Sequence, residues 1–137
     1  MSLSDNRTAD LWKQLMPRRT EVKNRITADY ISMQKYGENW NFSPDALFEK
    51  WASVEVSSFV EVLFNMDSYL LKGGMYVVFI HHGPASAAAK SMQYIFGQWL
   101  HDSAYVLDNR EHFEILPENY NPADPEAREE IWVPIKE

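Results

Sequence analysis

Cysteine is absent from this chain, and so is any long hydrophobic run. The 137 residues contain no cysteine, which excludes disulfide bonds and thiolate metal sites and fits a reducing compartment. No apolar run approaches the ~20 residues that a membrane-spanning helix needs, and the first residues lack the apolar core of a signal peptide. We therefore expect a cytoplasmic protein with no membrane partner.

Positive charge is also scarce. The 13 Lys and Arg residues face 20 Asp and Glu residues, and the resulting net charge of -7 would repel a phosphate backbone. The basic cluster of Arg18, Arg19, Lys23 and Arg25 has helical spacing, which favours a solvated helix face over a nucleic-acid contact. No direct nucleic-acid partner is expected.

Motifs for cofactor, metal or nucleophile chemistry are missing as well. The chain has no glycine-rich phosphate loop and no Ser/His/Asp arrangement in a recognisable context. His81 and His82 are neighbours in an expected strand, so their side chains point to opposite faces and cannot chelate one ion. His101 and His112 add no ligand spacing, and we expect no metal and no cofactor.

Aromatic residues, in contrast, are plentiful. They make up 14% of the chain, and 45% of the residues are hydrophobic, which suits one folded domain of this length. Aromatic side chains beyond the needs of a core often line a binding site. The position of the aromatics is therefore the first guide to function.

The chain is expected to open with an interrupted helix. Thr8 can cap its N-terminus, and Asp10 suits its first turn. Pro17 removes a backbone donor, so we predict a kink or two abutting segments near Met16, with the helix ending by Thr27.

Alternating apolar and polar residues predict strands further along the chain. The expected strands cover residues 30–36, 50–56, 75–82, 112–116 and 130–135, with a short one at 68–71 and a loop at 37–44. Residues 76–80 are apolar on both faces, which favours a central position in the sheet. A helix with an apolar stripe follows Pro84. The order is helix-strand-strand, then strand-helix-strand-strand, so an α+β pattern repeats, and its first copy lacks the opening strand.

The closing strand carries the clearest candidate site. Read with period 2, Ile131, Val133 and Ile135 share one face, and Glu130 lies beside Trp132 on the other. An indole next to a carboxylate would suit a flat organic cation, because the ring stacks and the carboxylate supplies charge. Alternation alone favours a solvated carboxylate at this position.

Four other residues are candidates for the same site. Trp51 occupies a strand position that corresponds to that of Trp132, and the two could face one another or simply pack. Glu55 shares the face of Trp51 and is the second candidate carboxylate, although a solvated position is favoured. Tyr76 and Tyr94 lie where their hydroxyl groups could reach a ligand.

Six fragments of the chain, taken in order, form a recognisable set. They are Leu11-Trp12 with Met16-Pro17-Arg18-Arg19; Phe48-Glu49-Lys50-Trp51-Ala52 with Val54-Glu55-Val56; Gly73-Gly74-Met75-Tyr76-Val77-Val78-Phe79; Tyr94-Ile95-Phe96-Gly97-Gln98-Trp99-Leu100; Leu107-Asp108-Asn109-Arg110 with Phe113-Glu114; and Glu130-Ile131-Trp132-Val133-Pro134-Ile135. Over almost the whole chain this set resembles the GyrI-like effector-binding domains, also called AraC-type bacterial effector-binding domains.

The resemblance implies a duplicated strand-helix-strand-strand module with an antiparallel sheet and two main helices on one face. The halves would cover about residues 8–58 and 66–136 of one domain, with a ligand cleft between them. Family members normally carry a strand before the first helix, and its absence would expose a sheet edge that could pair with a second chain as a homodimer. The carboxylate of the family cleft would fall on Glu130.

Three functions follow from the resemblance. The first is a stand-alone binding protein for hydrophobic, cationic, drug-like molecules, related to transcription regulation and acting by sequestration or through a separate regulator. The second is a hydrolase of strained cyclopropane-bearing toxins, with Glu130 as general acid or base and Tyr76 or Tyr94 orienting the leaving group. The third is a module that interacts with gyrase, a topoisomerase.

Overall fold

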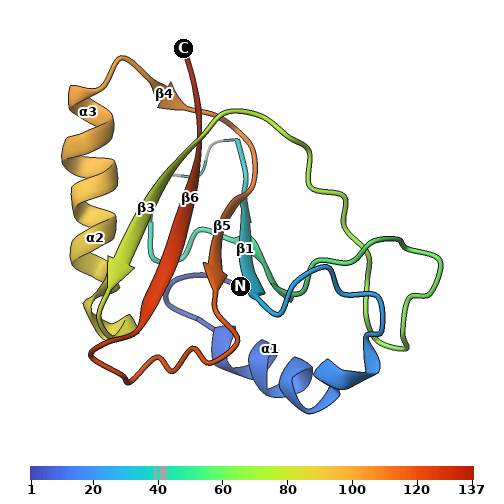
Figure 1. The fold of residues 1–137 in the computed structure, drawn as a ribbon. Coiled ribbons are helices and arrows are strands. Elements are labelled where there is room, and N and C mark those ends of the chain that lie inside the picture. The colour runs from blue at the N-terminus through green and yellow to red at the C-terminus, as the bar shows by residue number, and fades with distance from the viewer. Residues whose placement is uncertain (39, 41–42) are drawn as a thin grey trace.

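The protein forms an antiparallel sheet with helices packed against it. The structure is a computed structural model that describes residues 1–38, 40 and 43–137, so residues 39, 41 and 42 of the expected loop at 37–44 lie outside the described residues. The sheet order is β2-β1-β5-β6-β3, with β4 paired to β6 (Figure 1). The strands are β1 (Tyr30–Tyr36), β2 (Phe48–Ser53), β3 (Tyr76–His82), β4 (Val106–Leu107), β5 (His112–Leu116) and β6 (Arg128–Lys136).

The two halves of the sheet meet at β1 and β5. These two strands pair antiparallel from Tyr30 opposite Leu116 to Gln34 opposite His112. On one side β2 pairs with β1, and on the other β6 pairs with β5 and β3 pairs with β6. The arrangement confirms the expected α+β fold with an antiparallel sheet.

The first helix is interrupted where proline predicts it. Helix α1 (Thr8–Leu15) continues directly into the 3₁₀ helix η1 (Met16–Glu21), with Pro17 in its first turn. The helix ends at Glu21, before the expected limit of Thr27. The expectation for its start was wrong, because the N-cap is Arg7, which makes no side-chain capping bond, and Thr8 is the first helical residue.

The second helix is one continuous element with a wide turn in it. It comprises the 3₁₀ turn η2 (Ala85–Ala87), α2 (Ala88–Tyr94), the π-helical segment η3 (Ile95–Trp99) and α3 (Leu100–Asp102). Ile95 is 1% exposed and packs with Ile131 and Val133 in the core. The half-buried residues around this core are Val77, Phe79, Met92, Phe96 and Leu107.

Both helices lie on the same face of the sheet, which we call the helix-bearing face. Helix α2 covers Ile131, which pairs with Glu114 on β5. Helix α1 places Trp12 against Tyr30 of β1, with ring centroids 5.9 Å apart. Because Tyr30 pairs with Leu116, two residues from Glu114, strand alternation puts both contacts on one face.

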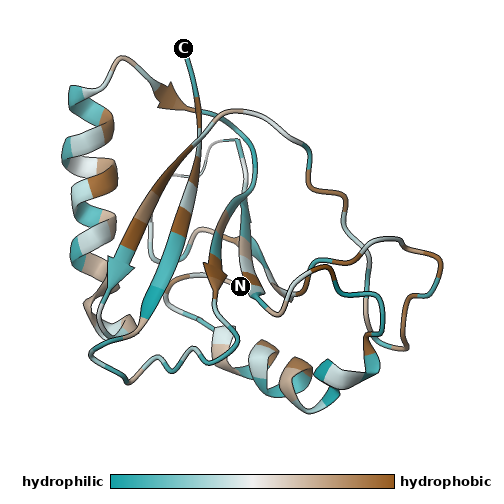
Figure 2. Cartoon of the chain, in the orientation of Figure 1, coloured by the Kyte–Doolittle hydropathy of each residue, from teal (hydrophilic) through white to brown (hydrophobic). Residues whose placement is uncertain are grey.

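The opposite face of the sheet, which we call the helix-free face, is formed by the side chains at the alternate positions of each strand. As expected for β6, the buried residues Ile131, Val133 and Ile135 alternate with Glu130 and Trp132. Figure 2 shows this alternation of hydrophobic and hydrophilic residues along β6.

The prediction that β3 lies centrally was wrong, because β3 is an edge strand paired only with β6 among the described strands. The side chains of residues 76–80 are apolar on both faces of the sheet, but only those on the helix-bearing face are covered by a helix. Phe79 packs under the second helix, whereas Val78 and Ile80 on the other face stay 40% and 60% exposed. Apolar residues on both faces of a strand therefore did not mean a neighbour on both edges.

Two strand boundaries also differ from expectation. Residues 68–71 form no strand, because this segment is held by side chains: the ring of Tyr69 packs against Trp51 at 5.2 Å, and its hydroxyl group donates to Glu111 at 2.7 Å. Strand β2 ends at Ser53, and beyond it Val56 forms only an isolated bridge with Arg25.

The residues before α1 form no strand within the described part of the chain. They nevertheless lie along the outer edge of β2. Met1 and Phe48 exchange two backbone hydrogen bonds of 3.0 and 2.9 Å, and the N–H of Ser4 donates to the carbonyl of Pro44 at 2.8 Å.

Candidate functional site

Three of the predicted site residues lie together on the helix-free face. The ring of Trp132 stacks on Phe113 with centroids 5.1 Å apart, and Tyr76 meets these rings at 5.7 and 5.3 Å respectively. Glu130 accepts a hydrogen bond of 3.2 Å from the indole N–H of Trp132. The predicted pairing of a carboxylate with aromatic rings therefore exists, and part of the hydrogen-bonding capacity of Glu130 is already used.

The other three predicted residues lie elsewhere. Trp51 shares a cross-strand row with Trp132, but β1 and β5 separate them, which amounts to roughly 14 Å at the usual strand spacing. Tyr94 lies on α2 and meets Phe79 at 6.3 Å. Glu55 is exposed beyond the end of β2.

A second carboxylate, Glu114, lies near the middle of the helix-bearing face. It comes from β5, and the side-chain amide of Gln34 on β1 donates to both of its oxygens at 3.0 and 3.1 Å. Burial raises the pKa of Glu114 to about 7; nearby Lys50 opposes this increase, and Glu129 adds to it. The protein therefore holds a carboxyl group that can exchange its proton near neutral pH.

Two more ionisable residues, Lys50 and Glu129, lie near Glu114. Burial lowers the pKa of Lys50, while Glu114 and Glu129 act to raise it. Glu129 is itself buried and accepts a hydrogen bond of 3.1 Å from the hydroxyl group of Tyr120. No ion pair within 4.0 Å joins Lys50 to Glu114 in the described part of the structure. With two carboxyl groups and one amine, this region favours positive charge when both carboxyl groups are ionised.

An aromatic cluster continues the same face toward the end of β1. The ring of Tyr36 stacks on Trp40 with centroids 4.1 Å apart and lies 4.9 Å from His112. Burial lowers the pKa of His112 to about 4, so its imidazole is neutral at neutral pH. The members of the cluster are Tyr36, Trp40, Phe48, Phe96 and His112.

The sequence interpretation missed Glu114, although a signal for it was present. His112, Glu114 and Leu116 alternate with Phe113 and Ile115, so two polar residues share one face of the strand expected at residues 112–116. The role of the cleft carboxylate was instead given to Glu130. The structure puts Glu130 on the helix-free face and Glu114 between the two helices.

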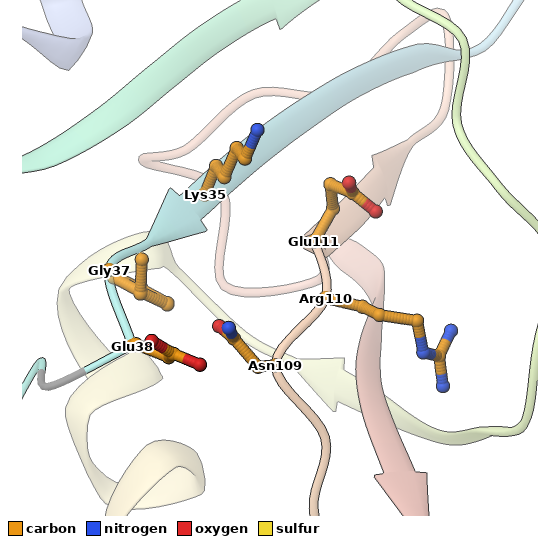
Figure 3. Close-up of a pocket in the computed structure, with 7 residues that line it drawn as sticks. Lys35, Gly37, Glu38, Asn109, Arg110 and Glu111 are labelled. Carbon is orange, nitrogen blue, oxygen red and sulfur yellow. The ribbon is translucent and has the colours of Figure 1, made fainter.

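Two recesses in the described part of the surface lie outside this region. One has a volume of about 250 Å³ and lies where β1 ends and the turn before β5 begins (Figure 3). In Figure 3 the side chains of Lys35 and Glu111 point to the same side, and that of Arg110 points away from them. The other recess, of about 330 Å³, lies between β3 and α2. Neither is lined by Glu114.

The described residues contain no group of three or more His, Asp or Glu side chains placed to hold a metal ion. None of the described helices is long and apolar enough to cross a membrane.

Comparison with known proteins agrees with this architecture. A similar solved structure is that of a Staphylococcus aureus MU50 protein, provisionally assigned to bacterial transcription regulation. It superposes with a TM-score of 0.65 at 14% identity, covering 96% of this chain and 81% of that one, which supports the fold alone. No curated protein matches the sequence. Residues 2–136 match the GyrI-like small molecule binding domain. The chain therefore belongs to the GyrI-like family of small-molecule binding domains.

Proposed function

We propose that this protein binds a hydrophobic, cationic small molecule on the helix-bearing face, with Glu114 selecting for positive charge. The family supports small-molecule binding in general. The observation that carries the finer proposal is the carboxyl group of Glu114, which burial holds at a pKa of about 7. An ionised carboxylate in such a place is stabilised by a cationic partner.

The surroundings of Glu114 suit a ligand that is both flat and charged. The aromatic cluster supplies ring faces on the same side of the sheet, where a ligand ring can stack. The amide of Gln34 fixes the orientation of the carboxylate. A bound cation would lower the pKa of Glu114, so binding near neutral pH should release a proton.

The helix-free face offers the competing location. Glu130, Trp132 and Tyr76 form a carboxylate and aromatic group there, as the sequence predicted. We favour Glu114, because burial raises its pKa to about 7 and a cationic partner would stabilise its ionised form. The two locations differ in which carboxylate a cation needs, and this difference can be measured.

The test is a calorimetric titration with aromatic cations and neutral analogues of the same shape. It compares the wild type with Glu114→Gln and with Glu130→Gln as the matched control on the opposite face. We expect Glu114→Gln to weaken cation binding by ~10-fold or more, about 1.4 kcal/mol, with neutral analogues unchanged. Weakening in Glu130→Gln alone would move the site to the helix-free face. Equal affinity in all three proteins would refute charge selection by either residue.

Hydrolysis of a strained ring is the second candidate, and the pKa of Glu114 favours it. A carboxyl group with a pKa of about 7 can take a proton from an attacking water and return it to the leaving carbon at neutral pH. Turnover distinguishes the two functions. A hydrolase consumes a cyclopropane-bearing substrate, detected by chromatography, and loses this activity in Glu114→Gln, whereas a binder returns its ligand intact.

A further inference from the structure

The outer edge of β3 presents unpaired backbone groups. Met75 accepts a hydrogen bond of 3.1 Å from the N–H of Ile135, and Gly83 donates one of 2.8 Å to Ala127, beyond the two ends of the β3–β6 ladder. Tyr76 faces Pro134, which has no N–H to donate. Hydrogen-bonded pairs alternate along an antiparallel ladder. The residues whose N–H and C=O groups point to the open edge are therefore Tyr76, Val78, Ile80 and His82.

This edge lacks the features that usually prevent pairing. Proteins protect edge strands with lysine, proline, bulges or a covering segment. Strand β3 contains neither lysine nor proline, and it pairs in regular register over all seven residues, Tyr76–His82. Val78 and Ile80, on the helix-free side of the edge, are 40% and 60% exposed. The edge is therefore an apolar template for another strand.

A groove runs beside the same edge on the helix-bearing face. This is the recess of about 330 Å³ between β3 and α2. Apolar side chains form most of its lining, and Lys90 lies at its side; the lining residues are Phe79, Ile80, Lys90, Ser91, Tyr94, Ile95 and Ile131. A free edge strand next to a helix groove is the arrangement that proteins use to bind an added strand.

We propose that the occupant of this edge is β3 of a second copy of the chain. A two-fold axis through Phe79 would place Tyr76 opposite His82 of the other copy and Val78 opposite Ile80. In that register the four residues whose backbone groups point to the open edge pair only with one another across the axis. Every free N–H and C=O group of the edge then has a hydrogen-bond partner. The strand is self-complementary in this antiparallel arrangement.

The helices fit the same two-fold arrangement. The second helix packs on residues of both β3 and β6, so its axis lies between these strands. Its symmetry mate would then lie two strand spacings away, about 9.6 Å, which matches the 8–10 Å between packed helices. Tyr94 is 49% exposed and contacts Phe79, so it lies near the proposed axis. Its ring would pack between the two symmetry-related helices.

The area and charge of the face also suit a dimer. A seven-residue strand is about 23 Å long, and a sheet with one helix layer is roughly 20 Å deep, so each copy would offer about 460 Å² in projection. The two copies together would bury about 920 Å² in projection, which lies in the range of weak, concentration-dependent association below ~1,200 Å². Tyr76–His82 carries no carboxylate, so the net charge of -7 is not concentrated at the contact.

Sedimentation velocity over a range of concentrations tests the proposal. We expect a concentration-dependent dimer in the wild type and at least a ~10-fold weaker one in Ile80→Lys, because lysine on an edge opposes strand pairing. The matched control is Val106→Lys, a 52%-exposed residue on β4, which should dimerise as the wild type does. A wild type that stays monomeric at high concentration, or equal dimerisation in the two variants, would overturn the proposal.

Cross-linking tests the register, because the chain contains no cysteine of its own. The double variant Val78→Cys/Ile80→Cys would place each new thiol opposite its counterpart, with Cα atoms about 5.5 Å apart, within disulfide range. We expect a band of twice the mass on a non-reducing gel after mild oxidation, and none for Val106→Cys. Equal cross-linking of both variants, or of neither, would overturn this register.

Discussion

On the helix-bearing face, the half-buried Glu114 and the buried His112 have pKa values shifted in opposite directions. Glu114 has a pKa raised to about 7 from its usual 4.5, and His112 has one lowered to about 4 from 6.5. Both shifts come chiefly from burial, which disfavours the charged form of each group. Over nearly the same pH range, the folded state therefore binds more protons at Glu114 than the unfolded state does, and fewer at His112.

The pH dependence of stability should reveal this opposition. The contribution of Glu114 is fully present below pH 4.5 and is lost as the pH rises to about 7, whereas that of His112 is absent near pH 4 and fully present above 6.5. Each amounts to as much as about 3 kcal/mol. In the wild type the two should largely cancel between pH 4.5 and 6.5.

Urea unfolding of single variants from pH 4 to 7.5 separates the two residues. In Glu114→Gln the free energy of unfolding should rise between pH 4 and 6.5, because only His112 remains. In His112→Gln it should fall between pH 4.5 and 7. Parallel curves for the wild type and Glu114→Gln would show that Glu114 titrates normally.

At the residue scale the sequence predicted which side chains of β6 share a face, but not which face the helices cover. Alternation correctly put Glu130 and Trp132 on one face and Ile131 on the other. Alternation cannot say which face the helices cover, because that depends on which residues of distant segments pack together. The long-range contact between Gln34 and Glu114 has no signature within either strand, so the carboxylate between the helices was missed.

At the scale of elements, the start of β3 depends on one arginine. The guanidinium group of Arg110 donates to Asp108 at 2.6 Å and to the carbonyl groups of Met75 and Ile135 at 2.5 and 3.3 Å. It therefore ties the turn before β5 to both β3 and β6. Gly74 makes room for it, since a Cβ atom there would lie 2.5 Å from Nη1 and 2.6 Å from Cζ.

Gly74→Ala should therefore destabilise the protein by about 1–3 kcal/mol, because the displaced guanidinium group loses its hydrogen bonds. Gly73→Ala is the matched control, since an added Cβ there meets nothing within 4 Å, and it should change stability by no more than about 0.5 kcal/mol. Denaturant unfolding measures both. If Arg110 is the cause, Gly74→Ala should cost much less in an Arg110→Ala background; an undiminished cost would point to the backbone instead.

The elements themselves were largely predictable where local signals are strong. Residues 30–36 and 112–116 form strands at the expected boundaries, and Pro17 divides the first helix at Met16. Failures occurred where distant contacts decide the outcome. The segment at residues 68–71 is tied by Tyr69 to Trp51 and Glu111, and β3 lies at an edge because β6 pairs with β5 on its other side.

At the scale of the whole molecule, the net charge of -7 should speed the arrival of cationic ligands. A field of this sign attracts cations over a distance set by salt, about 30 Å at 0.01 M ionic strength and 8 Å at 0.15 M. We expect the association rate of an aromatic cation, followed by stopped-flow tryptophan fluorescence, to fall several-fold between these conditions. A neutral analogue should associate at a constant rate.

The two effects of charge can be separated by variant. Glu114→Gln changes the net charge of -7 by at most one unit, so it should leave the salt dependence of association nearly intact and raise the dissociation rate instead. Exposed carboxylates behave in the opposite way. Replacing Glu55 and Glu61, both exposed, by Gln should reduce the salt dependence without changing dissociation. If Glu114→Gln altered only association, the carboxylate between the helices would attract the ligand without contacting it.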